Sequence, residues 1–294
     1  MNPGASTRRH LDALLGQFDG AGAIARDPIR FPRRYADPAD AELAGVVAAL
    51  LAYGRVDLFG PVIERLLARM DDAGGPHRYL SSFDGDPFLD DVVYRWNRGP
   101  DFVLLYTALR RVLAEHGSVG AVFAPGPAAA SLSGAIATLR GVSPTPWTRG
   151  YRTWLTDPAD GSACKRWLML MRWMVRRDGG DLGLWAHLSP ADLVIPVDTH
   201  VHRVSRFLGL TQRTTADWRA AEEITTALRR FDPRDPVKYD FALAHLGISG
   251  ACLGHREVAV CSGCRLDPVC RAPAAAPSRP AAPRSPRRDR AAPS

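Results

Sequence analysis

Residues 195–210 read IPVDTHVHRVSRFLGL. Val201, Val204 and Leu208 recur at the three- and four-residue spacing that places side chains on one face of a helix. Asp198 stands just before this apolar run, where an aspartate can cap the first turn by accepting hydrogen bonds from backbone N–H groups. The stretch therefore predicts a short amphipathic helix with a carboxylate at its start.

The rest of the chain also reads as a succession of helices. Stretches with helical apolar periodicity are 43–53, 62–70, 102–113, 165–177, 218–228 and 237–246. Gly60 and Pro61 are expected to separate the first two, and Asp235-Pro236 and Gly247 to bound the last. No convincing run of five or more residues alternates between apolar and polar side chains, so the predicted fold class is all-α.

The composition is that of a globular protein, with 46% hydrophobic and 23% charged residues in a chain of 294. The apolar stretch 43–53 is shorter than the roughly 18 residues that a membrane span needs. The first residues, MNPGASTRRHLDALL, lack the apolar segment of a secretory signal. We therefore expect a cytoplasmic protein, associated with the nucleoid if it binds DNA, without a membrane partner or an obligate protein partner.

Much of the net charge of +7 lies at the C-terminus. Residues 273–294 hold five arginines and one aspartate, which account for +4, so the rest of the chain carries only +3. This segment is rich in proline, alanine and arginine and cannot bury a core, so we expect a disordered tail. Binding to nucleic acid would then depend on a local basic face rather than on overall charge.

Four of the five cysteines, Cys252, Cys261, Cys264 and Cys270, form the pattern C-x8-C-x2-C-x5-C. Disulfides are not expected in a cytoplasmic chain of this size. A structural zinc site usually has two close cysteine pairs, whereas four thiolates on a compact loop suit a [4Fe–4S] cluster. We predict such a cluster, with zinc or unligated thiols as the alternatives. Cys164 stands apart and is expected to be an ordinary partly buried thiol.

Residues 195–210 and the cysteine loop together resemble the endonuclease III-like, or helix-hairpin-helix, DNA glycosylases. Those proteins carry a V-D-T-H-x-x-R-V element ahead of a C-x6-C-x2-C-x5-C iron–sulfur loop, whereas the first gap here is eight residues long. The resemblance implies two helical lobes and, between them, a cleft that admits damaged double-stranded DNA.

Almost all of residues 10–250 also resembles a bacterial family of conserved proteins without assigned function, distantly related to those glycosylases. The stretches that carry this resemblance are LAYGR (51–55), GSACKR (161–166), MRWMVR (171–176) and DPVKYDFAL (235–243). By analogy, residues 37–185 form one helical lobe and residues 186–272 form the lobe that carries the cluster. The N-terminal segment 1–36 is expected to pack on the second lobe.

In the glycosylases, a helix-hairpin-helix with a G-x-G-x-K turn precedes the catalytic aspartate. Gly161 and Lys165 match the first glycine and the lysine, and Ala163 replaces the second glycine, so a degenerate hairpin is implied in the first lobe. Glycines at such a turn let backbone N–H groups approach a DNA phosphate. Lys165 and Asp198 are 33 positions apart, farther than in endonuclease III, so the inserted residues 178–190 must rebuild the geometry.

Only two of the 38 basic residues are lysines, Lys165 and Lys238. A lysine amine can attack the sugar carbon that carries a damaged base and form a Schiff base, which permits strand cleavage. Arginine cannot, because its guanidinium keeps its proton in a protein. The resemblance implies that Lys165 is the nucleophile and that Asp198 stabilises the developing positive charge or moves the amine proton. A solvated lysine and a purely structural N-cap are the alternatives.

Further residues are candidates for contacting nucleic acid. Tyr53 and Arg55 fall where the glycosylases carry a residue that fills the gap left by a flipped base. Gly161 and Arg166 lie on either side of the candidate nucleophile. Lys238 is expected to touch a phosphate, to be solvated, or to form an ion pair with Asp235 or Asp240.

The leading function is a DNA repair glycosylase, with or without AP-lyase activity, acting on an unidentified damaged base. Two alternatives keep the same fold. A non-catalytic DNA- or RNA-binding protein is favoured by the altered hairpin and by the stretched spacing. In an iron–sulfur redox-sensing or regulatory protein, the cluster would act and Lys165 would have no role.

Overall fold

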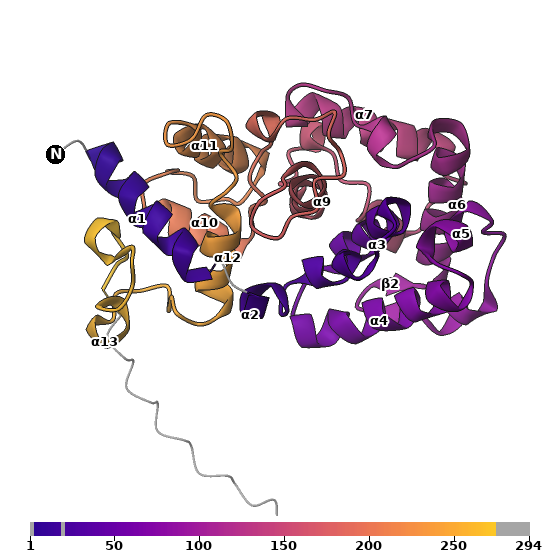
Figure 1. Cartoon of the computed structure of the whole chain (residues 1–294), viewed down its shortest axis with the longest axis horizontal. Helices are drawn as coiled ribbons and strands as arrows, with labels where there is room; N and C mark the ends of the chain where they lie inside the picture. Colours follow the sequence, from indigo (N-terminus) through magenta and orange to yellow (C-terminus); the bar gives the residue numbers. More distant parts are fainter. Residues whose placement is uncertain (1–2, 19–20, 275–294) are drawn as a thin grey trace, which may run out of the picture.

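A computed structural model of the chain describes residues 3–18 and 21–274, and these are mostly helical (Figure 1). The α-helices, in chain order, are α1 (Pro3–Phe18), α2 (Ala21–Ile24), α3 (Pro38–Leu51), α4 (Val56–Asp72), α5 (Pro76–Ser81), α6 (Gly99–His116), α7 (Ala128–Val142), α8 (Arg149–Arg152), α9 (Lys165–Val175), α10 (Thr199–Phe207), α11 (Trp218–Arg229), α12 (Asp240–Ile248) and α13 (Val258–Cys261). The prediction of a helical protein is confirmed.

Short 3-10 turns join several of these helices. They are η1 (Pro28–Arg30), η2 (Pro32–Arg34), η3 (Pro87–Asp91), η4 (Gly120–Val122), η5 (Pro158–Asp160), η6 (Pro190–Asp192) and η7 (Asp267–Val269). One antiparallel hairpin, β1 (Val93–Tyr94) and β2 (Asn97–Arg98), precedes α6. Strands of two residues are too short to produce a visible alternation, so the sequence does not predict this hairpin.

The helices gather toward the two ends of the long axis (Figure 1). Helices α3 to α7 lie at one end, α1 and α10 to α13 lie at the other, and α9 lies between them. Helix α9 packs against α3, and α12 packs against both α10 and α1. The boundaries 37–185 and 186–272 stay predictions, and the predicted tail from 275 onward lies outside the described residues.

Helix α3 packs against α4, α5 and α9. All its residues from 41 to 51 are buried. Gly45 faces α9, and a Cβ at this position would overlap the methyl group of Met174. Gly45 therefore leaves room for the Met174 side chain between α3 and α9.

The predicted break at Gly60 and Pro61 is wrong, because α4 begins at Val56 and continues through both residues. Pro61 lies in the second turn of the helix, so its missing N–H removes one hydrogen bond near the helix start. The chain instead turns at Gly54, whose φ of 85° is in the left-handed region that favours glycine.

The predicted bounds of the last long helix, Asp235-Pro236 and Gly247, are also wrong. The Asp232 carboxylate accepts two backbone hydrogen bonds that hold the following residues in a turn, so α12 begins only at Asp240. The helix continues through Gly247, where a Cβ would lie 2.5 Å from the His200 ring. Glycine is therefore required here for α12 to pack on α10.

Buried ion pairs connect α9 to α12 and to the segment that follows α9. Arg172 of α9 donates to Asp240 of α12, with Nη1 2.6 Å from Oδ2, and its Nη2 lies 3.2 Å from Oδ1 of Asp181. Arg176 contacts Asp181 and also Asp235, the latter at 2.9 Å. The side chains of Arg172 and Asp181 are 4% and 1% exposed, so removing one partner would leave an unpaired buried charge.

The N-terminal residues also attach to α12 and its preceding turn. The Tyr239 hydroxyl donates to Oδ1 of Asp12 at 2.8 Å. His245 Nε2 lies 3.2 Å from Oδ2 of Asp27. Among the helices of residues 3–18 and 21–274, none combines the length and the apolar character that crossing a membrane requires.

We predict that Arg172→Met destabilises the protein by about 3–5 kcal/mol, because it leaves the buried Asp240 without its cation and removes one of the two cations of Asp181. Urea denaturation measures the change. Arg34→Met is the matched control: Arg34 pairs with Glu64, but both side chains are about half exposed, at 40% and 45%, so the loss should be under about 1 kcal/mol. Equal losses in the two variants would contradict the role given to the buried network.

The destabilisation by Arg172→Met should shrink as the pH falls. Burial already raises the pKa of Asp181 and Asp240, and Arg172 counteracts the rise in both. Without Arg172 the folded-state pKa values rise further, so the folded variant binds more protons than the unfolded chain and gains stability on acidification. Denaturation at about pH 7 and about pH 5 should therefore give a smaller difference from the wild type at the lower pH.

Candidate functional site

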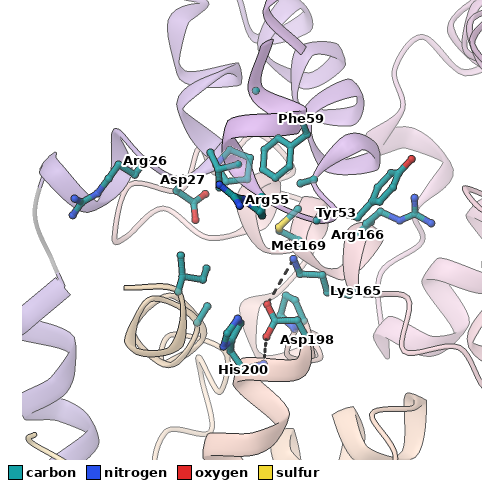
Figure 2. Close-up of a pocket in the computed structure, with 18 of the residues that line it drawn as sticks. Arg26, Asp27, Tyr53, Arg55, Phe59, Lys165, Arg166, Met169, Asp198 and His200 are labelled. Atoms are coloured by element: carbon teal, nitrogen blue, oxygen red, sulfur yellow. Dashed lines mark hydrogen bonds and ion pairs between the residues drawn. The ribbon is translucent and has the colours of Figure 1, made fainter. Parts of the chain in front are cut away.

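A cavity of about 1820 Å³ is lined by segments that are far apart in the sequence (Figure 2). Its lining comes from the turn before α3, the α3–α4 junction, the first turns of α9 and α10, and one face of α12. Typical small-molecule sites enclose a few hundred to about 1,000 Å³. The cavity therefore has room for part of a larger, polymeric ligand.

Lys165 is the first residue of α9 and lines this cavity. Cys164 before it has a left-handed conformation, with φ at 45°, so the chain turns sharply into the helix. The side chain of Lys165 is 31% exposed. The amine is thus held at a helix start and remains accessible from the cavity.

Asp198 lies opposite Lys165 and uses its two carboxylate oxygens differently (Figure 2). Oδ1 accepts hydrogen bonds from the backbone N–H groups of His200 and Val201, both at 2.9 Å, and so caps α10 as predicted. Oδ2 lies 3.9 Å from Nζ of Lys165. The structure therefore brings together an amine and a carboxylate that are 33 positions apart.

Further charged residues line the same cavity. Burial raises the pKa of Asp240 to about 6, although Arg172 opposes the rise. Asp198 raises the pKa of Asp240 further, whereas Lys165 lowers it, so the three groups interact electrostatically. Burial opposes ionisation of Asp27, but the hydrogen bond to His245 and the charge of Arg172 leave the pKa of Asp27 below its usual value.

Tyr53, Arg55 and Arg166 also line the cavity. The guanidinium of Arg166 donates to the carbonyls of Leu50 and Thr153 and lies 5.2 Å from the centre of the Tyr53 ring. Burial lowers the pKa of Arg166 to about 10. Arg55 precedes α4 and pairs with Asp57 at 2.6 Å, and its side chain is 77% exposed. Arg166 therefore supports the wall of the cavity, whereas Arg55 is accessible at its edge.

Gly161 and Lys238 do not line the cavity. The N–H of Gly161 donates to the carbonyl of Pro158 at 2.9 Å, and its φ of 76° ends η5. The turn before α9 therefore uses this glycine for its backbone conformation. Lys238 forms ion pairs with other aspartates than the expected Asp235 or Asp240: Nζ lies 2.9 Å from Asp232 and 3.7 Å from Asp12.

The four clustered cysteines lie in the segment that follows α12. All four are free and partly buried. Burial raises the pKa of the Cys264 and Cys270 thiols, and the neighbouring cysteines raise it further, so the thiols lie close enough to interact. Within the described residues, no group of three or more His, Cys, Asp or Glu side chains is arranged to hold a metal ion. Cys164 is separate from them and buried, and burial raises its pKa to about 11.

Several residues of the cavity are missed by the sequence analysis. Trp96, Asp27 and His245 come from unrelated segments, and no pattern in the sequence connects them. Arg172 and Asp240 belong to MRWMVR and DPVKYDFAL, two stretches that carry the family resemblance and could have drawn attention to them. Such a resemblance marks a stretch without assigning a role to its side chains.

We predict that Asp198→Ala destabilises the protein by about 1 kcal/mol, whereas Asp198→Asn has a much smaller effect. The asparagine side-chain oxygen can accept the same two backbone hydrogen bonds, so the cap survives while the charge facing Lys165 is lost. Thermal or urea unfolding of both variants measures the difference. An asparagine variant as unstable as the alanine variant would show that the ion pair, and not the cap, stabilises this helix start.

Comparison with known proteins identifies a family. The profile described as "Protein of unknown function (DUF2400)" matches residues 27–249. No curated protein and no solved structure matches the chain. The matched span contains Lys165 and Asp198 and nearly all of the cavity lining, and it ends before the cysteine loop. Because the match covers well over half of the sequence, the chain belongs to the DUF2400 family of proteins of unknown function.

Proposed function

We propose that this protein is a DNA N-glycosylase, with or without AP-lyase activity, that removes a damaged base. One observation carries the proposal: the Lys165 amine and the Asp198 carboxylate lie 3.9 Å apart, at the starts of two helices, inside a large cavity. A distant relationship to the endonuclease III-like glycosylases is part of the same proposal. It is supported by the V-D-T-H-x-x-R-V match that begins at Val197.

The chemistry assigned to Lys165 requires a primary amine. Nζ forms a bond to the sugar carbon C1′ while the bond from C1′ to the base nitrogen breaks, and the base leaves with the electron pair. Loss of a proton from the amine and opening of the sugar ring then give a Schiff base, from which strand cleavage can follow. The 31% exposure of Lys165 makes this amine accessible to a sugar in the cavity.

The carboxylate of Asp198 is placed to assist in two ways. Oδ2 faces the amine and can accept its proton. The same negative charge stabilises the positive charge that develops on the sugar as the base departs. Because Oδ1 is held by two backbone hydrogen bonds, the carboxylate keeps this orientation without reorganisation.

A damaged base within duplex DNA reaches such a site only when it is rotated out of the stack. The cavity volume of about 1820 Å³ exceeds what one base requires, which leaves room for the adjoining backbone. Arg26, Arg30, Arg55 and Arg65 line the cavity and offer positive charge to phosphates. Double-stranded DNA is therefore the proposed partner, and association with the nucleoid would follow from binding it.

A [4Fe–4S] cluster on Cys252, Cys261, Cys264 and Cys270 is proposed as a cofactor, with zinc as the alternative. Four free, partly buried thiols that interact electrostatically are the donor set such a cluster needs. The cluster would stabilise the loop that contacts α10, where Arg203 lies 3.4 Å from the Cys252 carbonyl. No step of the proposed reaction depends on it.

We predict that borohydride traps the protein covalently on duplex oligonucleotides that carry its lesion or an abasic site, if it has lyase activity. Lys165→Arg keeps the charge but should abolish the adduct and base release, since a guanidinium does not act as the nucleophile. Lys238→Arg is the matched control, because it changes the only other lysine of the chain. Asp198→Asn should slow base release by on the order of 10²–10⁴-fold.

The same assay separates the proposal from its alternatives. An adduct that persists in Lys165→Arg would disprove the assigned nucleophile. Base release without an adduct, still dependent on Lys165, would indicate a glycosylase without lyase activity. DNA affinity without either reaction, across a panel of lesions, would favour a non-catalytic binding protein. An accessible redox couple without DNA affinity would favour the redox sensor.

We predict that anaerobically purified protein is brown and contains iron and acid-labile sulfide. Cys252→Ser and Cys264→Ser should each lose most of both, because each removes one of four thiolate ligands. Cys164→Ser is the control, since Cys164 is buried beside Lys165 and belongs to a different part of the structure. Metal analysis measures the iron content, and visible absorption reports the cluster. Zinc in place of iron would support the alternative metal, and a metal-free chain would mean unligated thiols.

A further inference from the structure

Trp96 is an unusual residue at the edge of the cavity. It lies at the tip of the β1–β2 hairpin, next to Arg95, whose φ of 53° places it in the left-handed region. Its side chain is 52% exposed, and among the exposed large apolar residues of the described chain it is the only aromatic one. An exposed indole that lines a cavity presents a large flat apolar face to whatever enters it.

The indole is held rigidly, because it stacks on Tyr53. The two ring centres are 5.1 Å apart and their planes differ by 13°. The Tyr53 hydroxyl donates to Oδ1 of the buried Asn97 at 2.5 Å and lies 3.2 Å from the Tyr94 carbonyl. The Arg166 guanidinium lies 5.2 Å from the Tyr53 ring. The hairpin, the α3–α4 junction and α9 therefore contribute a series of planar groups, and Trp96 is its exposed end.

The nearly parallel rings restrict the kind of ligand. Aromatic cages for cationic ligands surround the cation with several rings, which a stack of two parallel rings does not do. Aromatic rings accompanied by arginines are instead the usual contacts of unpaired nucleobases, since every base has a flat face that can extend such a stack. Arg95 lies against Gly54, and its guanidinium is 6.0 Å from the Tyr53 ring, so positive charge for the backbone phosphate is close by.

We propose that Trp96 is the stacking platform for an unpaired nucleobase at the edge of the cavity. The inference rests on the proposed function in one respect, that the ligand is DNA, and it adds the residue that selects DNA with a locally unpaired nucleotide. Tyr53, which the sequence analysis places next to the flipped base, then acts beneath Trp96 as its support. Trp96 contacts the base through its exposed face and has no part in the chemistry of Lys165.

The test uses the full chain and two oligonucleotide duplexes, one fully paired and one with a single unpaired 2-aminopurine. Fluorescence anisotropy gives the affinity, and quenching of 2-aminopurine reports stacking. Trp96→Ala should weaken binding to the duplex with the unpaired base by about tenfold and abolish the quenching, with little change on the paired duplex. Trp96→Phe should retain most of both signals, because it keeps a flat aromatic face.

Val93→Ala is the matched control. Val93 is in the same hairpin and is 53% exposed, but it does not line the cavity, so its replacement should leave both signals unchanged. Circular dichroism verifies that all variants are folded. The inference would be overturned if Trp96→Ala kept wild-type affinity and quenching, or if it lost equal affinity for both duplexes. Absence of DNA binding by the wild-type protein would also overturn it.

The outcome can be separated from that of the proposed catalysis. Quenching that depends on Trp96 and persists in Lys165→Arg supports the stacking platform even if no lesion is ever released. A Lys165-dependent adduct that forms normally with Trp96→Ala, without a quenching change, leaves the catalytic proposal intact and removes Trp96 from it.

Discussion

The guanidinium of Arg172 is bonded to Asp240 and Asp181 in a region that is nearly closed to water. Through these contacts α9 is fixed to α12, and α12 packs against α10. Lys165 begins α9 and Asp198 caps α10. The distance between the amine and the carboxylate therefore depends on the buried ion pairs of Arg172. Because each buried charge needs its partner, the arrangement tolerates few substitutions, which is how a fold can hold together two side chains that are 33 positions apart.

The regular helices could be predicted from the sequence, because their apolar spacing reports directly which face is buried. The stretch 195–210 is the best example, since both the helix and its Asp198 cap are confirmed. The predicted helix boundaries are wrong where tertiary packing outweighs the tendency of glycine and proline to end a helix. Gly247 lies inside α12 because a larger residue would meet His200, and α4 accommodates Pro61 because the turn is made at Gly54.

The resemblance pairs Lys165 with Asp198, and the structure has the two side chains 3.9 Å apart. The rest of the cavity is a property of tertiary structure alone. Arg172 finds partners 9 and 68 positions away, and no periodicity encodes such distances. The sequence does not predict Trp96 as a residue of the cavity for a related reason. It stacks on the Tyr53 ring, which comes from another segment of the chain. Gly161, by contrast, matches a phosphate-binding pattern but serves the backbone turn of η5.

Because one oxygen of Asp198 caps the first turn of α10, the side chain cannot rotate toward a ligand without breaking both cap hydrogen bonds. The spacing between carboxylate and amine is thus set when the protein folds, before any ligand arrives. A ligand that enters the cavity has to displace solvent but need not rearrange these side chains. The interactions that fold the protein also fix the position of this carboxylate, so changes that loosen the start of α10 would misplace it well before they unfold the molecule.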